Sequence, residues 1–296
     1  HSDEFVKENQ WPGLEYPRVP GHEVAGTVEA VGANVSSWTP GDAVGVGWHG
    51  GHCYTCEACR HGDFINCENG EVTGISYDGG YAEYLTVPEE AVVGRPTSLD
   101  PEEAAPLLCA GVPTYNALRN SSARGGDLVA VLGVGGLGHL ALQYADALGC
   151  EVVALSTSPE KQGEAEGFGA DHFVDVNDSE GAEALQSMGG ADVIAATAPN
   201  GDAISSVIPG LDREGELLLL GVDDHPVEFQ VLDLIDGRKS IKGWPCGSSI
   251  HSEETLRFSA QQDVKPAIET YDLEDAGQAY EDMIQGKVRY RAVLVP

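Results

Sequence analysis

Four closely spaced cysteines form the clearest chemical pattern in the chain. They follow the spacing C-x2-C-x2-C-x7-C, at Cys53, Cys56, Cys59 and Cys67. Four thiolates suit the tetrahedral coordination of one zinc ion, and an iron–sulfur cluster is the competing possibility for four cysteines. The segment contains few apolar residues, so a bound metal would supply folding free energy that packing cannot. The pattern therefore favours a structural zinc site.

A glycine-rich turn is the second pattern. An apolar run that ends at Leu132 is followed by G-x-G-x-x-G and then by a helical pattern that closes at Gly149. In such a strand–turn–helix unit, the first glycine allows the tight turn, the second lets a pyrophosphate approach, and the third permits close packing. The helix N-terminus favours phosphate there. We therefore predict a dinucleotide site that comprises Gly133, Gly135, Gly136, Leu137 and Gly138.

The end of the next strand distinguishes NAD from NADP. NAD enzymes place an Asp or Glu there to hold the ribose hydroxyls. Here the apolar run ends at Ser156, followed by Thr157 and Ser158, with Lys161 close behind. Hydroxyls and a lysine can bind a phosphate, and no carboxylate stands at the strand end to repel it. The sequence therefore favours NADP over NAD.

The elements that position these sites fall into two kinds of segment. Strands and helices alternate over 113–245, which predicts a doubly wound parallel sheet. The preceding segment 1–112 is rich in glycine and proline, with strands expected at Val24–Val31 and Gly79–Val87 and a helix at Pro101–Leu108. We expect residues 246–296 to return to this β-rich domain, and residues 53–67 to form a separate lobe within it.

Charge and cysteine content limit the classes of partner. The 296 residues include 48 acids and 16 bases, a net charge of −32, which argues against binding nucleic acid or anionic membranes. The acids are scattered, which favours a carboxylate-rich surface suited to a high-salt (halophilic) cytoplasm, with an ordinary acidic enzyme as the alternative. No apolar run approaches the length of a membrane span. The odd count of seven cysteines with tight spacing favours metal binding in a reducing cytosol, so we predict a cytoplasmic protein.

Two further motifs complete a family pattern. Gly21-His22-Glu23 and Leu107-Leu108-Cys109-Ala110-Gly111 occur with the cysteine lobe and the glycine turn in one order. Together they resemble the zinc-containing alcohol dehydrogenases of the medium-chain dehydrogenase/reductase family, near the yeast-type and cinnamyl-alcohol-dehydrogenase-like branch. The resemblance covers essentially the whole chain. It implies an α/β protein with a GroES-like β-rich catalytic domain and a Rossmann doubly wound parallel sheet.

The resemblance also implies an activity and a catalytic zinc. The reaction is reversible hydride transfer between a primary or secondary alcohol and NAD(P), with a small alcohol or aldehyde substrate and a homo-oligomer, dimeric or tetrameric. The zinc is held by a cysteine, by His22 and by Cys109, with Glu23 as an alternate ligand. That first cysteine is expected directly before His1, so we expect the chain to be N-terminally incomplete. Trp48 and Leu108 indicate an apolar substrate pocket.

Further roles follow from matching positions. Ser2 matches the hydroxyl that begins the proton relay, and Asp3 matches the carboxylate that orients the histidine ligand. His1 and Arg291 match residues that contact the cofactor. Phe5 stands where the family has its relay histidine, so the proton needs another route.

Several residues and functions remain open to other interpretations. We expect His49, His52 and His61 to be surface residues, Cys150 and Cys246 to be structural, and His139 to contact the cofactor or cap the helix. The alternatives to a zinc alcohol dehydrogenase are a zinc-free quinone-reductase-like member of the same superfamily and an inactive fragment that keeps only cofactor binding.

Overall fold

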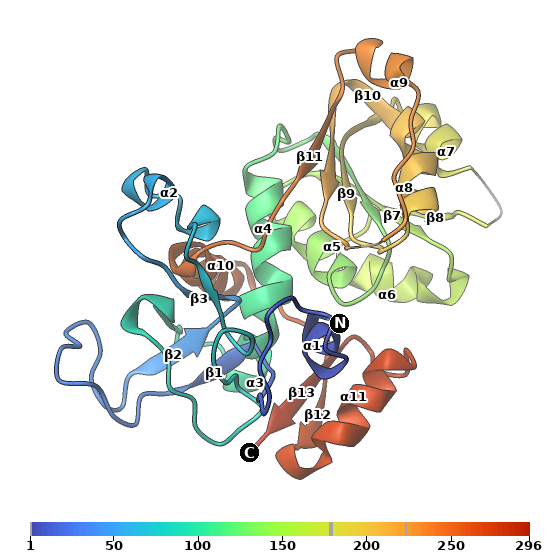
Figure 1. The fold of residues 1–296 in the computed structure, drawn as a ribbon. Coiled ribbons are helices and arrows are strands. Elements are labelled where there is room, and N and C mark those ends of the chain that lie inside the picture. Colours follow the sequence, from blue (N-terminus) through green and yellow to red (C-terminus); the bar gives the residue numbers. More distant parts are fainter. Residues whose placement is uncertain (1, 178–179, 223) are drawn as a thin grey trace. The chain divides into compact units, whose positions relative to one another are not determined.

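The chain divides into two compact units. A computed structural model describes residues 2–177, 180–222 and 224–296 (Figure 1). The first unit joins His1–Val112 to Cys246–Pro296, and the second is the continuous segment Pro113–Pro245. The second unit is therefore inserted within the sequence of the first.

Short strands build the first unit. Their bounds are Val24–Thr27 (β1), Ala43–Val46 (β2), His49–Gly51 (β3), Glu71–Val72 (β4), Val92–Gly94 (β5), Ile268–Asp272 (β12) and Arg291–Val295 (β13). The order β1-β2-β5 forms an antiparallel sheet, with Val24 opposite Val46. β3 pairs with β4, and β12 runs parallel to β13, so the C-terminal strand belongs to this unit.

The helices of the first unit include an unusual wide turn. Their bounds are Ser2–Lys7 (α1), Glu57–Arg60 (α2), Pro101–Pro106 (α3), Leu107–Gly111 (the π-helical turn η3), Ser249–Gln262 (α10) and Ala276–Ile284 (α11). α3 starts with Asp100 at the N-cap and Pro101 in its first turn, where the fixed φ of proline suits a helix. It ends at Pro106 and passes directly into η3.

A six-stranded parallel sheet forms the second unit (Figure 1). Its strands are Leu128–Leu132 (β6), Glu151–Ser156 (β7), His172–Asp175 (β8), Ala191–Ala196 (β9), Leu211–Leu219 (β10) and Ser240–Gly243 (β11), in the order β11-β10-β9-β6-β7-β8. β6 and β9 are neighbours although two strands separate them in sequence. In doubly wound sheets, ligands bind beyond the carboxyl ends of the strands at this switch point.

Helices cover both faces of this sheet. Their bounds are Val112–Arg119 (α4), Gly138–Ala147 (α5), Gln162–Gly167 (α6), Gly181–Ser187 (α7), Gly201–Val207 (α8) and Val231–Ile235 (α9). Leu128 and Leu132 of β6 belong to a buried cluster with Leu185 of α7 and Ile204 of α8. Side chains alternate along a strand, so the buried Val129 and Val131 face the opposite side. This burial on both faces explains the continuous apolar runs of the sequence.

Two predicted elements differ from the structure. The strand expected over Val24–Val31 ends at Thr27. The helix expected over Pro101–Leu108 is confirmed, as α3 followed without a break by the π-helical turn. The segment Gly79–Val87 contains neither helix nor strand. The backbone amides at 79–81 donate instead to carbonyls at Val19–Gly21, and this pairing of two loops replaces a sheet ladder.

The helices of the described residues are short. α10 is the longest, with 14 residues. Within the described ranges, no helix combines the length and apolar character needed to cross a membrane.

Candidate active site

The four cysteines of the lobe converge on one point. Their sulfurs all lie within 4.8 Å of one another, the one group of this kind found among the described residues. Cys67 Sγ lies 3.8 Å from Cys56 Sγ and 3.6 Å from Cys53 Sγ. Metal–sulfur bonds of about 2.3 Å in a tetrahedral site separate the sulfurs by about 3.8 Å. The residues therefore fit one zinc ion, whereas an iron–sulfur cluster, with several irons each holding a cysteine, requires wider spacing.

Electrostatics at these thiols also favour a cation. Hydrogen bonds from Thr55 and from backbone amides lower the pKa of Cys53 to about 5. Burial and neighbouring thiols raise the pKa of Cys59 to about 12. Cys59 can therefore be ionised together with Cys53 near neutral pH only with a positive ion beside them.

The prediction that His49 and His52 lie on the surface is wrong. They are 4% and 9% exposed, and His52 Nδ1 lies 3.2 Å from His49 Nε2. His52 also stacks on Phe64, with ring centroids 4.1 Å apart. The short strand β3 carries His49 into the interior, and the aromatic contact covers His52. His61 is exposed, as predicted.

His22 is held by a carboxylate from α1. It is buried, and its Nδ1 lies 3.0 Å from Asp3 Oδ1. Burial would raise the pKa of Asp3, but the charge and hydrogen bond of His22 outweigh it and lower that pKa to about 2. Because an ionised carboxylate only accepts hydrogen bonds, Nδ1 of His22 carries a proton and donates it. The other ring nitrogen, Nε2, is thereby left to act as a ligand.

Cys109 lies against His22. It occupies η3, whose wide turn places its thiol within hydrogen-bond reach of the His22 side chain. A hydrogen bond with Cys246 and burial raise the pKa of Cys109 well above its usual value. Cys246 Sγ also approaches the Cys109 carbonyl at 4.0 Å. Two residue types that bind zinc therefore meet here, with a second thiol beside them.

Glu23 and Arg291 form an ion pair within the first unit. Glu23 Oε2 pairs with the Arg291 guanidinium, and Glu23 Oε1 accepts the Ala110 amide at 3.1 Å. Both carboxylate oxygens are thus engaged, one of them with the residue that follows Cys109. The cofactor contact of Arg291 and the ligand role of Glu23 stay predictions.

Aromatic side chains surround His22. The Trp48 ring meets His22 edge-on with centroids 5.0 Å apart, and Trp11 meets Trp48 at 5.8 Å. Leu108, expected in the pocket, is instead fully buried and packs against Gly45. Its place in η3, one residue before Cys109, turns it into the core.

In the second unit, the glycine turn has the backbone that a dinucleotide site needs. Gly133 has φ +93°, and a Cβ there would lie 2.8 Å from the Ala198 side chain. A Cβ on Gly138 would overlap the Gly133 carbonyl, so the helix packs directly on the turn. At Gly135, by contrast, a Cβ would meet nothing within 4 Å. The residues therefore fit a pyrophosphate above Gly135, next to the N-terminus of α5.

Residues beyond β7 lie close to this turn. Lys161 Nζ donates to the Val134 carbonyl at 2.7 Å, which places the ammonium beside the glycine turn. Ser156 is buried, and its Oγ accepts the Ser158 amide at 3.1 Å, while Thr157 is exposed. His139 is fully buried and hydrogen-bonds the Gly135 carbonyl at 3.0 Å through Nδ1, which ties α5 to the glycine turn. It does not cap the helix, because Leu137 is the N-cap of α5 and no side chain accepts its free amides.

Other predicted residues have less definite surroundings. His1 lies outside the described residues. Ser2 and Phe5 are half-buried in α1, and Gly136 and Leu137 lie in the glycine turn. Sequence reasoning missed Trp11, the position of Cys246 beside Cys109, and Tyr81, whose hydroxyl donates to Asp3 Oδ2 at 3.1 Å. Tyr81 and Cys246 approach the site from distant parts of the chain, and no spacing rule connects any of these residues to it.

Comparison with known proteins agrees with this arrangement. The model of the alcohol dehydrogenase GroES-like domain matches residues 1–97, and that of the zinc-binding dehydrogenase matches residues 136–261. The chain is 42% identical to alcohol dehydrogenase notN of Aspergillus sp., over 99% of this chain and 86% of the relative.

Solved structures show the same relationship. A cinnamyl alcohol dehydrogenase of Sorghum bicolor matches with a TM-score of 0.91 and 35% identity, covering 99% of this chain and 86% of the other. The CAD of Helicobacter pylori, solved with NADP(H), matches with a TM-score of 0.88 and 29% identity, again over 99% and 86%. The chain therefore belongs to the zinc-containing alcohol dehydrogenases of the medium-chain dehydrogenase/reductase family, and it is an NAD(P)-dependent alcohol dehydrogenase.

Proposed function

We propose that His22 and Cys109 hold a catalytic zinc in the first unit and that the glycine turn of the second unit binds NADP. The observation that carries the first part is the contact of His22 with Cys109, while Asp3 engages the other side of the imidazole. When bound, the zinc would supply Lewis acidity at the substrate oxygen and the nicotinamide would exchange hydride with the substrate carbon.

The chain's own residues would orient the substrate and move its proton. Asp3 keeps the His22 ring in one tautomer and one orientation. The Ser2 hydroxyl, at the start of α1, would accept the proton of the alcohol while it releases its own proton to water. Phe5 cannot accept that proton, because it has no ionisable group. Trp48 and Trp11 limit water near His22 and favour an apolar primary or secondary alcohol, or the aldehyde of a primary one.

The preference for NADP is supported by the residues beyond β7. Lys161 places a positive charge beside the glycine turn, and β7 ends in hydroxyls rather than a carboxylate. An ammonium and hydroxyl groups bind the 2′-phosphate through charge-assisted hydrogen bonds. The NADP(H) complex of the Helicobacter relative is consistent with this preference.

Replacing Ser156 by Asp tests this choice of cofactor. A carboxylate at the end of β7 repels the 2′-phosphate and accepts the ribose hydroxyls of NAD. The ratio of kcat/KM for NADP to that for NAD should fall by at least about tenfold, the effect of one charge-assisted hydrogen bond of about 1.5–3 kcal/mol. Steady-state kinetics with a panel of primary alcohols measures it, with Ser156→Ala as the uncharged control. A wild-type chain that uses NAD severalfold better than NADP would contradict the proposal.

We also propose that the cysteine lobe carries a structural zinc. Cys67→Ser should remove one zinc per chain in elemental analysis and lower the thermal midpoint, because the lobe has little apolar surface to hold it together. Cys150→Ser is the matched control, since Cys150 is a buried thiol of the second unit. An unchanged zinc content in the Cys67 variant would exclude this site.

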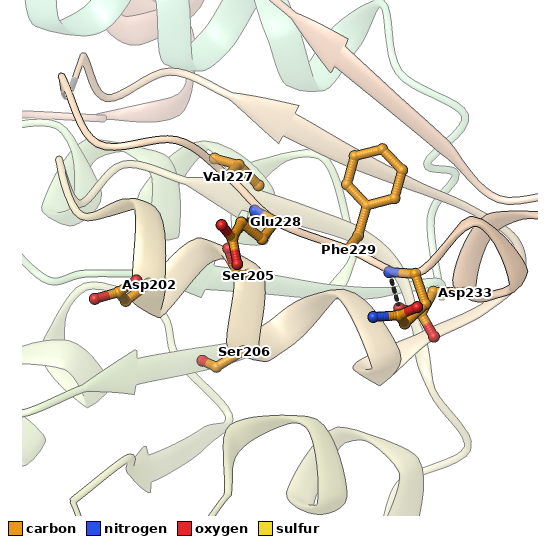
Figure 2. A pocket seen from close by; sticks show the side chains of 8 residues that line it. Asp202, Ser205, Ser206, Val227, Glu228, Phe229 and Asp233 are labelled. Atoms are coloured by element: carbon orange, nitrogen blue, oxygen red, sulfur yellow. Dashed lines mark hydrogen bonds between the residues drawn. The ribbon is translucent and has the colours of Figure 1, made fainter.

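A homo-oligomer is supported by an apolar surface of the second unit. In α9, Val231, Leu232 and Ile235 are 69%, 68% and 65% exposed. Phe229 projects from the segment that leads into α9 (Figure 2), beside a groove that also includes Asp202 and Ser205 of α8. β11, next along the chain, is an edge strand of the sheet. Exposed apolar groups next to an unpaired strand edge favour association.

The charge pattern indicates where a second copy of the chain would meet the least repulsion, because Arg238 and Lys242 already neutralise Glu214 and Glu216 of β10. Two chains that each carry −32 repel one another, so they associate best where bases gather. Four of the 16 bases lie on or beside β10 and β11: Arg213, Arg238, Lys239 and Lys242.

Leu232→Glu should therefore lower the oligomeric mass. It places a charge in an interface from which water is excluded. Light scattering after size exclusion measures the mass, and Ile250→Glu, at a half-exposed position of α10, is the control. A monomeric wild-type chain, or a variant with the wild-type mass, would contradict the interface.

Finally, we propose that the enzyme works in a salt-rich cytoplasm. The support is the excess of 48 acids over 16 bases and the presence of all seven cysteines as free thiols. The urea midpoint of unfolding should rise between 0.1 and 2 M KCl, because the Debye length falls from about 10 Å at 0.1 M to about 3 Å at 1 M and screens the repulsion. A midpoint that is already maximal at 0.1 M KCl would rule this out.

A further inference from the structure

Tyr81 contacts the candidate zinc site without offering it a ligand. Its hydroxyl donates to Asp3 Oδ2 at 3.1 Å, across 78 positions of sequence. The opposite oxygen, Asp3 Oδ1, faces His22 Nδ1 at 3.0 Å and accepts the Gly21 amide at 3.1 Å. Three donors from two segments, Gly21-His22 and the loop that contains Tyr81, therefore hold one carboxylate.

We propose that Tyr81 is a positioning residue: it fixes Asp3, which in turn fixes the His22 imidazole for metal binding. The inference rests on the proposed role of His22 as a zinc ligand. Neither composition nor spacing identifies Tyr81 as part of this site.

The direction of each hydrogen bond follows from the charges. Asp3 is ionised and accepts from both sides. Burial, the charge of Asp3 and the hydrogen bond to it raise the pKa of Tyr81 well above its usual value, so the phenol keeps its proton and remains a donor. A phenylalanine in its place would leave Oδ2 of a partly buried carboxylate without this donor.

The backbone delivers this hydroxyl to its position. The amides of Gly79, Gly80 and Tyr81 donate to the carbonyls of Val19, Gly21 and Pro20 at 2.7, 2.9 and 3.0 Å. The two loops therefore bind each other directly beside His22.

Two glycines make this close approach possible. Gly21 has φ +105°, and a Cβ there would lie 2.5 Å from Tyr81 Cδ1. A Cβ on Gly79 would overlap the Gly21 carbonyl. Gly79-Gly80-Tyr81 therefore packs directly against Gly21-His22, and a change in either loop displaces the Tyr81 hydroxyl.

Arg291 is a competing partner for Asp3. A small cavity is lined by Asp3, Glu23, Tyr81 and Arg291, and the Arg291 guanidinium interacts with the charge of Asp3. Without the phenol hydroxyl, the Asp3 carboxylate can turn toward this cation and away from His22. Tyr81 therefore keeps the Asp3 carboxylate hydrogen-bonded to the His22 imidazole.

Tyr81→Phe in the full chain tests the proposal with two measurements. The first is the ring ¹⁵N spectrum of the metal-free, histidine-labelled chain, in which the His22 signals are assigned by their loss in His22→Gln. Although burial lowers it, the charges of Cys109 and Asp3 raise the pKa of His22 well above its usual value, so the spectrum is recorded above that pKa, where the ring is neutral. The tautomer with the proton on Nδ1 should then dominate in the wild type and lose population in the variant. The second is Co²⁺ affinity at the His22 site by chelator competition, which should weaken about tenfold.

Two further variants separate positioning from general structure. Tyr77→Phe is the matched control, because its hydroxyl donates to the Gly50 carbonyl at 2.8 Å in the same unit; it should leave both measurements unchanged. Asp3→Asn should reproduce the loss of Co²⁺ affinity, and adding Tyr81→Phe to it should cause no further loss if Tyr81 acts through Asp3.

The outcomes distinguish this inference from the proposed function. An unchanged His22 tautomer in Tyr81→Phe, or losses that add in the double variant, would overturn the positioning role. If the wild-type chain binds no Co²⁺ at His22, the zinc proposal fails, and a shifted tautomer in Tyr81→Phe still supports the action of Tyr81 on His22 through Asp3.

Discussion

An imidazole can bind a metal only when one nitrogen is free of its proton and aimed at the ion, and this constraint organises the first unit. Asp3 imposes it on His22 by accepting the proton at Nδ1. The carboxylate itself needs support, because a buried negative charge is costly unless several donors hold it. The first helix, the 19–21 loop and the 79–81 loop meet at this carboxylate and supply that support.

The need to aim a ligand at the metal also explains why Cys109, the second candidate zinc ligand, lies on a π-helical turn. A regular α-helix continuing from α3 would carry residue 109 around to a different direction. The wider turn changes the direction of the side chains locally while Leu107 and Leu108 stay fully buried. The core thus holds the turn in place, and the Glu23 carboxylate holds the following amide of Ala110.

Motifs with a strict spacing were predictable from the sequence. The cysteine lobe, the glycine turn and the parallel sheet each depend on short-range patterns in the sequence, and the structure contains them at those residues. The 79–87 segment was not predictable, because its alternation resembles a strand while its partner is a loop about 60 residues away. The burial of His49 and the contact of Tyr81 with Asp3 are likewise long-range, and no periodicity encodes them. Cys246 was assigned a structural role because its nearest site residue, Cys109, is 137 positions distant.

The insertion of one unit within the other has a consequence for synthesis. Residues 113–245 are continuous, so this unit can fold as soon as it leaves the ribosome. The first unit cannot be completed then, because β13 and Arg291, the partner of Glu23, are made only after the whole second unit. The sheet β1-β2-β5 and the cysteine lobe are synthesised before the second unit, and the sheet β12-β13 of the same unit follows only after it. A nascent chain that captures zinc in the lobe during this interval would have a folded region within its otherwise incomplete first unit.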